Sequence, residues 1–208
     1  MFITTKKFQF NELFLSDKSD SYISKIAKYI HQTDKYIYPY IYKEEHDPSW
    51  IEIISACLRH SENLFYHKNI IAVLDNDEII GIANVVKCGQ KYTFMECIPQ
   101  CVSPYSNLLK SKPNINYFVP LIKEIENLDG YYLCNFCIDE KYRNQGIGHH
   151  LLKEVIRLNP GTIHTDALSD NTAAIKVYTD NGFTITEKFT GYSGKHPKGL
   201  ECVKLIKE

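Results

Sequence analysis

The chain has 208 residues, of which 44% are hydrophobic and 24% are charged, and its formal net charge at neutral pH is −1. These values are ordinary for a globular protein, and we expect residues 1–208 to form a single domain. A balanced charge argues against a general nucleic-acid binder, which usually carries a basic face. We therefore expect no nucleic acid as a partner. No segment reaches the roughly 20 apolar residues of a membrane span, so we expect no membrane as a partner either.

The first 68 residues are predicted to be mostly helical. Residues 21–30 carry apolar side chains at helical spacing, and residues 50–58 repeat this pattern just after Pro48, which suits a helix start. The tyrosine-rich residues 36–42, followed by acidic residues, could line a pocket for a cationic amine. The alternative, which we favour, is that they form an aromatic edge of the core beside an exposed charged turn.

The period changes to that of strands from residue 69 onward, where we expect the sheet core. Residues 69–74 and 78–86 are short runs rich in β-branched residues, separated by the turn composition Asp75-Asn76-Asp77, and predict a β-hairpin. Residues 91–98 could form a third strand and residues 119–128 a short helix.

The C-terminal part alternates strands and helices, and its strand–helix–strand spacing predicts a parallel crossover. With the hairpin, this pattern indicates a mixed α/β sheet. Exposed edge strands near the C-terminus would allow a homodimer. The predicted strands are 131–138, 162–168, 183–189 and 200–207, and the predicted helices are 148–158 and 171–179.

Seven cysteines are scattered through the chain, and Cys134 and Cys137 form one C-x-x-C pair. The pair falls in a predicted strand, where residues three apart should point to opposite faces. No second pair or spaced histidines complete a metal set, so we expect buried thiols and no metal. The N-terminus shows no export signal, and reduced thiols then indicate a cytoplasmic protein.

The segment Arg143-Asn-Gln-Gly-Ile-Gly148 lies between a predicted strand and a predicted helix. A helix start leaves about four backbone N–H groups without partners, and the helix dipole adds positive charge there. Gly146 and Gly148 remove the Cβ atoms that would keep an anion away, and Arg143 can add charged donors. The segment therefore predicts a phosphate site. It is neither a P-loop nor a dinucleotide fingerprint, since position 151 is leucine.

The pattern Arg-x-x-Gly-x-Gly after a strand, approached by Asp139-Glu-Lys-Tyr, resembles the acetyl-CoA pyrophosphate loop of the GNAT superfamily of N-acetyltransferases. Asn171 to Tyr178, followed by Asn181-Gly-Phe183, resembles a second element of that family. The resemblance implies an acyl-CoA N-acyltransferase fold, with a twisted, mostly antiparallel sheet, a central parallel strand pair and flanking helices. It also implies acetyl-CoA as cosubstrate, with the acceptor side in residues 1–68 and the acetyl-CoA site in the sheet core of residues 69–208. The cofactor-binding residues that it indicates are Phe136, Cys137, Ile138, Arg143, Asn144, Gln145, Gly146, Ile147, Gly148, His149, Asn171 and Tyr178.

By the same resemblance, Tyr178 would protonate the departing thiolate. A phenol with pKa near 10 is a reasonable acid toward a thiolate with pKa near 8.5. A backbone N–H of the 131–138 strand could stabilise the carbonyl oxygen. For the base that deprotonates the amine we nominate Glu96, with Glu126 or a chain of waters as alternatives. Asn135 could face the acceptor but cannot act as a base.

The predicted function is transfer of the acetyl group of acetyl-CoA to a primary amine, in one ternary complex and without a covalent intermediate. A small-molecule amine is the expected partner. Two alternatives stay open: a non-catalytic acyl-CoA sensor, and a protein acetyltransferase acting on lysines or N-termini. Tyr178 separates the first from an enzyme, because a sensor needs no acid at the sulfur.

Overall fold

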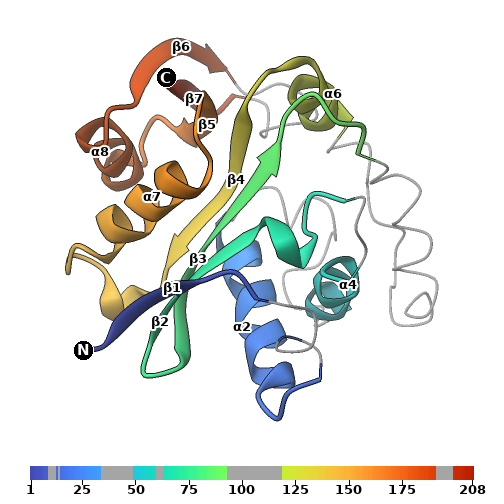
Figure 1. The fold of residues 1–208 in the computed structure, drawn as a ribbon. Coiled ribbons are helices and arrows are strands. Elements are labelled where there is room, and N and C mark those ends of the chain that lie inside the picture. Colours follow the sequence, from blue (N-terminus) through green and yellow to red (C-terminus); the bar gives the residue numbers. More distant parts are fainter. Residues whose placement is uncertain (9–12, 14, 34–48, 60–62, 93–118, 191–198) are drawn as a thin grey trace.

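The computed structural model describes residues 1–8, 13, 15–33, 49–59, 63–92, 119–190 and 199–208. Its described strands form one sheet in the order β1-β2-β3-β4-β5-β7-β6 (Figure 1). The strands are β1 (Ile3–Lys6), β2 (Ile70–Asp75), β3 (Glu78–Lys87), β4 (Tyr131–Ile138), β5 (Ile163–Leu168), β6 (Thr184–Thr190) and β7 (Glu201–Lys207). The helices are α2 (Ser19–Gln32), α4 (Ser49–Cys57), α6 (Val119–Asn127), α7 (Ile147–Leu158) and α8 (Thr172–Asp180), with the short 3-10 turns η1 (His67–Asn69) and η4 (Glu140–Tyr142).

The predicted hairpin of β2 and β3 is confirmed. The two strands pair antiparallel, and the two loop residues Asn76 and Asp77 have φ of 48° and 66°. Left-handed conformations at both positions match the twist of the flanking strands, and Asn and Asp tolerate them better than most residues. The strand β1 was missed by the sequence analysis, which expected helices there. Its four residues alternate between half-buried and exposed and pair with β2 at the edge of the sheet.

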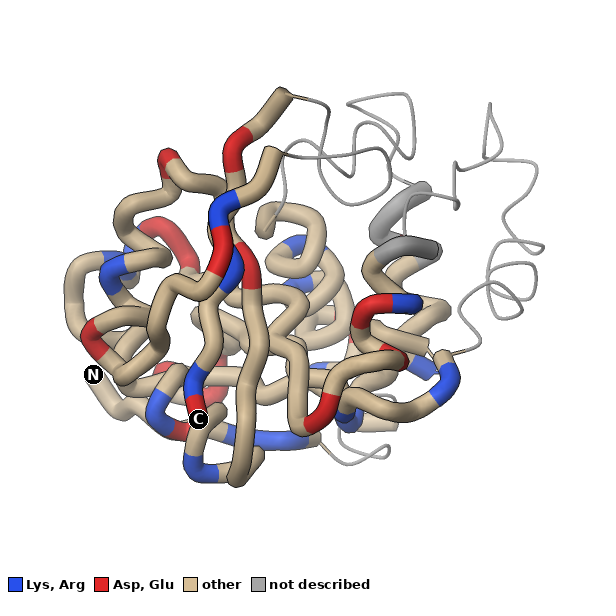
Figure 2. The backbone as a smooth tube through the Cα atoms, turned by 90° about the horizontal axis from the view of Figure 1, so that it is seen from above, with Lys and Arg blue, Asp and Glu red and all other residues tan. Residues whose placement is uncertain are grey.

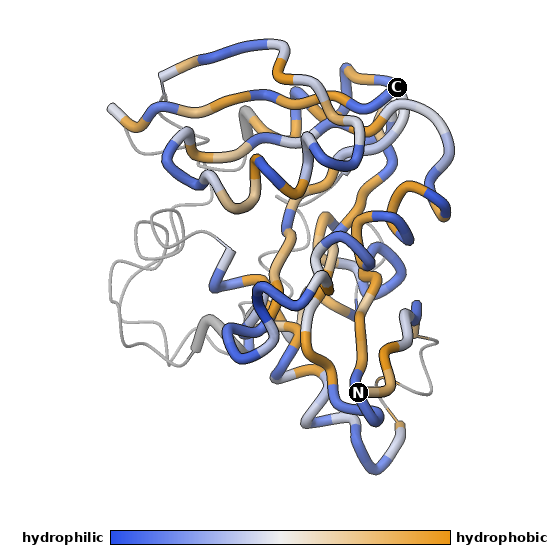
Figure 3. Tube along the Cα trace, turned by 90° about the vertical axis from the view of Figure 1, so that its left-hand side faces the viewer, coloured by the Kyte–Doolittle hydropathy of each residue, from blue (hydrophilic) through white to orange (hydrophobic). Residues whose placement is uncertain are grey.

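Helices cover both faces of the sheet and give two apolar clusters. On one face, α2 buries Ile23, Ile26 and Ile30 in a cluster that also takes residues from α4 and α6. On the other face, α7 and α8 pack against the sheet and bury Leu152 and Tyr178 in the second cluster (Figure 1). The hydropathy colouring of Figure 3 shows the apolar stretches running along the central strands. The predicted helices at these positions are confirmed.

The strands β4 and β5 form the parallel pair, and they stay together over a short length. The register couples Tyr131 with Ile163 and Tyr132 with His164. Slightly farther on, Thr165 Oγ1 donates to Leu133 O at 3.0 Å. Beyond that point β4 continues with β3 alone in the described register. The result is a mostly antiparallel sheet with one parallel pair that opens along β4, which confirms the predicted fold class.

A β-bulge in β4 corrects one prediction. Asn84 pairs with Asn135 and Val85 pairs with Leu133, so Cys134 is an extra residue on β4. One extra residue shifts the alternation of side chains, and Cys134 and Cys137 therefore pack against the same apolar cluster rather than on opposite faces. Both are thiols outside any disulfide, and burial raises the pKa of Cys137 to about 11 although Arg143 partly offsets it.

Acidic and basic positions are mixed along the described trace (Figure 2). None of the helices in the described ranges has the length and apolar character needed to cross a membrane. Within the same ranges, no three His, Cys, Asp or Glu residues gather as a metal set.

Candidate active site

The loop before α7 has the backbone of an anion site. Gly146 is the N-cap of α7 with φ of 78°, and Asn144 before it has φ of 61°. An N-cap without a side chain leaves the first N–H groups of the helix accessible, and they have no acceptor inside the helix. Residues 143–146 are exposed, whereas Ile147 is buried and anchors the helix start. The loop therefore exposes the N-terminus of α7 to solvent, while the buried Ile147 side chain holds the start of the helix in place.

The approach to this loop is tied to α2 on the other face of the sheet. Asp139 caps η4 by accepting from Lys141 N at 3.1 Å, and its second oxygen accepts from Tyr29 OH at 2.9 Å. Burial raises the pKa of Asp139, but these two hydrogen bonds and the charge of Lys25 outweigh it and hold the pKa below the usual value. The Asp139 carboxylate is thus a charged link between α2 and the loop.

Arg143 lies along the end of β4. Its Nε donates to Ile138 O at 3.1 Å, so the guanidinium sits where β4 meets the loop. Asp139 N donates to Ile80 O at 2.8 Å, which places the backbone groups of Asp139 on the β3 side. Because these groups alternate along a strand, those of Ile138 and Phe136 point to the opposite edge, where β5 has already separated. That edge can accept an extended chain as an added strand.

Gly148, in the first turn of α7, faces the seam between β4 and α8. A Cβ at this position would lie 3.8 Å from Phe136 Cε1 and from Val177 Cγ2, and 3.9 Å from Ile138 Cγ1. These are ordinary contact distances, so glycine is not required by a clash within the protein. Glycine instead leaves open the space that a Cβ atom would fill between β4 and α8.

Tyr178 closes this seam from α8. Its side chain is 4% exposed, and its ring lies between Phe136 and Phe183, with centroid distances of 5.9 and 5.5 Å. Its hydroxyl lies near the Thr165 side chain, which donates to Leu133 O at the point where β4 and β5 separate. Burial raises the pKa of Tyr178, with the charge of Asp166 adding to the effect and Thr165 opposing it. The phenol therefore keeps its proton at neutral pH.

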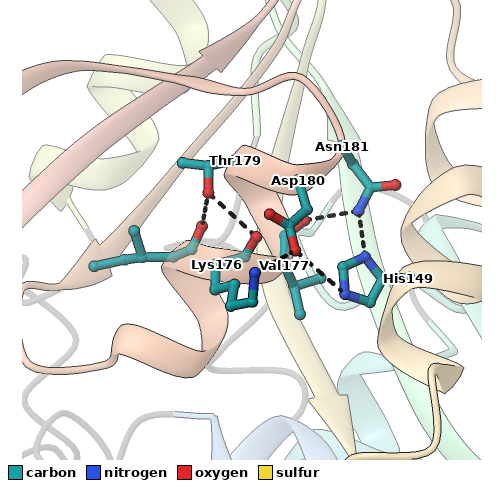
Figure 4. A network of polar contacts seen from close by, with 7 residues as sticks. His149, Lys176, Val177, Thr179, Asp180 and Asn181 are labelled. Carbon is teal, nitrogen blue, oxygen red and sulfur yellow. Dashed lines mark hydrogen bonds and ion pairs between the residues drawn. The ribbon is translucent and has the colours of Figure 1, made fainter.

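A polar network joins the end of α8 to the first turn of α7 (Figure 4). Asn181 Nδ2 donates to Val177 O at 2.7 Å and contacts His149 Nδ1 at 2.9 Å. Asp180 lies 3.8 Å from His149 Nε2 and pairs with Lys176 at 2.9 Å. The sequence analysis placed Asn181 in the second element that resembles the GNAT family but did not predict this link to His149.

Asn171 is the N-cap of α8, where its Oδ1 accepts from Ala174 N at 3.2 Å. The structure thus gives it a capping role, and its contact with the cofactor arm stays a prediction.

The candidates for the acceptor side are less concentrated. Asn135 is 8% exposed and donates to Thr33 Oγ1 at 2.8 Å, which ties β4 to the end of α2. Asn84 donates to Asn135 Oδ1 at 2.9 Å. Glu126 accepts from Tyr92 N at 3.2 Å. Glu96, residues 36–42 and most of the predicted third strand lie outside the described residues.

One acidic residue of this region was not singled out from the sequence. Asp166 follows Thr165 on β5, and its Oδ1 accepts from Tyr132 OH at 3.0 Å. A lone aspartate in a strand gave no signal, because its position depends on where β4 and β5 part.

The family described as acetyltransferase (GNAT) domain matches residues 117–185. This range contains β4, the loop, α7, β5 and α8, which together carry the site described above. Over these residues the chain is similar to the acetyltransferase (GNAT) domain family, whose members are acyltransferases. No curated protein matches the sequence.

Solved structures show the GNAT fold over nearly the whole chain. An acetyltransferase crystal structure has a TM-score of 0.72 at 20% identity, with 99% of this chain and 98% of that chain covered. An N-acetyltransferase from Staphylococcus aureus Mu50 has a TM-score of 0.62 at 16% identity, with coverages of 98% and 99%. Arabidopsis thaliana Naa50, in complex with the bisubstrate analogue CoA-Ac-MVNAL, has a TM-score of 0.51 at 16% identity, with coverages of 99% and 98%.

Proposed function

We propose that this GNAT protein transfers the acetyl group of acetyl-CoA to a primary amine within one ternary complex. The observation that carries the proposal is the opening between β4 and β5, which has the α7 N-terminus at one end and the Tyr178 hydroxyl at the other. An acyl-CoA has matching parts in the same order: a pyrophosphate, an extended arm with amide groups, and a thioester.

The residues present fit such a ligand. The first N–H groups of α7, with Arg143 beside them, suit a pyrophosphate. The edge of β4 that faces away from β3, from Phe136 to Ile138, suits the amides of the pantetheine arm, which would pair like an added strand. Arg143 Nε holds the Ile138 carbonyl at the end of this edge, next to the place proposed for the pyrophosphate. The GNAT-fold neighbours support a CoA ligand, since Naa50 was solved with a CoA-containing analogue and the NatC complex was solved with CoA.

The chemistry follows from the opening itself. Burial keeps Tyr178 protonated at neutral pH and makes it a weaker acid than a free phenol. A thiolate that forms in the same buried place gains basicity from the same loss of water, so the phenol can give it a proton as the C–S bond breaks. Backbone N–H groups on the free edge of β4 would stabilise the carbonyl oxygen while it gains negative charge. Both substrates meet in the opening, so the amine can attack the thioester directly and no enzyme nucleophile is needed.

The acceptor class has two candidates. A small primary amine is our first proposal. An N-terminal amino group of a protein is the second, because GNAT-fold neighbours include the ribosomal-protein-S18-alanine N-acetyltransferase of Escherichia coli, with a TM-score of 0.52 at 15% identity. A panel that contains both kinds of amine separates the two.

Binding of acetyl-CoA can be tested by thermal unfolding of the purified protein with acetyl-CoA, with CoA and with NADH. A ligand at a hundred times its dissociation constant adds about 2.7 kcal/mol of stability. Since each kcal/mol shifts the midpoint of a protein of this size by roughly 2–4 °C, we expect an increase of about 5–10 °C with acetyl-CoA. NADH also carries a pyrophosphate but no pantetheine arm, and we expect no shift with it. No shift with saturating acetyl-CoA would contradict the proposed site.

A further inference from the structure

The carboxylate of Asp166 lies at the opening between β4 and β5, on the face opposite to Tyr178. The last residue of β5 that pairs with β4 is His164, opposite Tyr132, and Asp166 comes two residues after it. Side chains alternate along a strand, and Thr165, which contacts Tyr178, therefore points to the α8 face while Asp166 points to the α2 face.

Tyr132 fixes the position of this carboxylate. The tyrosine is 2% exposed, it belongs to the apolar cluster on the α2 face, and its hydroxyl donates to Asp166 Oδ1 at 3.0 Å. A buried phenol is held in place by its packing, so its hydrogen bond orients the carboxylate. One oxygen of Asp166 accepts this bond, and a carboxylate oxygen has further lone pairs for a second donor.

The charged groups around Asp166 come from neighbouring elements. Lys204 lies opposite Asp166 in the register with β7, and its Nζ is 2.9 Å from Glu187 Oε2 and 3.5 Å from Glu124 Oε1. On β5 itself, His164 points to the same face, and its Nε2 contacts Asp129 O at 3.0 Å. Glu187 and Glu124 thus pair with one lysine, and Asp166 lies opposite that lysine in the register. Three carboxylates for one lysine leave an excess of negative charge on this face, which favours an ammonium group nearby.

We propose that Asp166 is the catalytic base that takes the proton of the acceptor amine, with Tyr132 as the residue that positions it. The inference rests on the proposed acetyl transfer and assigns a group that the sequence analysis had sought in Glu96 or Glu126. The acid Tyr178 and the base Asp166 then act from opposite faces of the sheet. Thr165, which contacts Tyr178, is the neighbour of Asp166 on β5.

The proton balance of the step is complete with these groups. The Asp166 carboxylate takes one proton from the ammonium, and the freed lone pair forms the C–N bond to the carbonyl carbon. The C–S bond then breaks with its electron pair on sulfur, and the sulfur takes the proton of Tyr178. A second proton leaves the nitrogen as the amide forms and restores Tyr178, while Asp166 releases its proton to water. The sum is an amide, CoA thiol and one proton.

The test compares Asp166→Asn with wild type and with Asp170→Asn, which makes the same change at an exposed position after β5. Release of CoA thiol from acetyl-CoA is followed with spermidine, 2-phenylethylamine, an alanine-terminated peptide and water as acceptors. We expect Asp166→Asn to lower kcat about 100-fold or more with every acceptor that wild type uses, as for loss of a general base. The midpoint shift with acetyl-CoA should stay unchanged, and Asp170→Asn should match wild type.

The pH profile separates a base from a residue that merely binds the ammonium or supports the fold. As the pH rises toward the pKa of the amine, near 10.4 for a lysine-like amine, solvent supplies free amine and the deficit of Asp166→Asn should shrink. Asp166→Glu should recover part of the rate. Tyr132→Phe removes a hydrogen bond to the charged carboxylate and should move the acidic limb of kcat/KM to higher pH.

Each contrary outcome has its own meaning. Turnover of Asp166→Asn within about threefold of wild type, or a higher KM for the amine at unchanged kcat, would overturn the role of Asp166 and leave the proposed function standing. Binding of acetyl-CoA without turnover of any acceptor by wild type would overturn both. If Asp166→Asn does not fold, Asp166→Glu and Tyr132→Phe decide: wild-type pH profiles in both would overturn the proposal.

Discussion

Replacing Tyr178 with phenylalanine is expected to lower the rate of acetyl transfer about 100-fold or more while the affinity for acetyl-CoA stays within about threefold. The reason is that the change removes one oxygen and keeps the ring, whose packing against Phe136 and Phe183 shapes the seam. Thr165 retains its bond to Leu133 O, so β4 and β5 should separate at the same point. Thiol release and equilibrium titration with acetyl-CoA measure the two quantities.

Tyr22→Phe is a matched control, since it removes a hydroxyl that bonds to Asp77 O at the β2–β3 turn, away from the opening. It should leave both quantities unchanged. Equal losses of binding and turnover in Tyr178→Phe would show a structural tyrosine. Unchanged turnover would mean that another group protonates the thiolate, and it would remove the argument that distinguishes an enzyme from an acyl-CoA sensor.

Replacing Gly148 with alanine is expected to change stability and acetyl-CoA affinity in opposite directions. The position is the second residue of α7 and the new Cβ meets its neighbours at 3.8 Å or more, so the free protein should gain at most about 0.5–1 kcal/mol, the helix-interior value for replacing glycine with alanine. The same methyl group projects into the seam between β4 and α8, where the proposed ligand lies. We expect acetyl-CoA to bind at least about tenfold more weakly, a loss of about 1.4 kcal/mol.

Thermal unfolding with and without acetyl-CoA measures both effects in one series. The midpoint should rise without ligand, and the ligand-induced shift should shrink at a fixed acetyl-CoA concentration. Gly161→Ala provides a contrast, because its Cβ would meet open space, its φ is 109°, and it lies in the turn before β5. That variant should lose stability through backbone strain and keep its affinity for acetyl-CoA. Unchanged affinity in Gly148→Ala would place the ligand elsewhere.

Much of the C-terminal half could be predicted from the sequence, because its local signals agree with its tertiary structure. The helix α7 starts one residue before the predicted start and ends at the predicted end, since Gly146 caps it and Asn-Pro-Gly follows it. Gly182 has φ of 86°, as expected for a glycine that ends a helix. The loop and Tyr178 lie together around one seam, although their roles toward acetyl-CoA remain predictions.

What the sequence did not show depends on contacts between distant segments. The bulge at Cys134 leaves the apolar pattern of β4 intact in the sequence. The face of the sheet on which each cysteine lies therefore follows only from the pairing of β4 with β3. The strand β1 is four residues long and owes its conformation to pairing with β2. Asp166 stands out only once the structure shows that β4 and β5 pair over a short length and that Tyr132, 34 positions earlier, donates to its carboxylate.

The most direct test of the account is mass spectrometry of acetyl transfer from isotopically labelled acetyl-CoA. Wild-type protein would be incubated with spermidine, 2-phenylethylamine and an alanine-terminated peptide. The masses of the amines and of the intact protein would then be measured. The account predicts labelled amide on at least one amine, one CoA thiol per amide, and no label on the protein during turnover. Label on the protein, or no labelled amide although acetyl-CoA binds, would contradict direct transfer in a ternary complex.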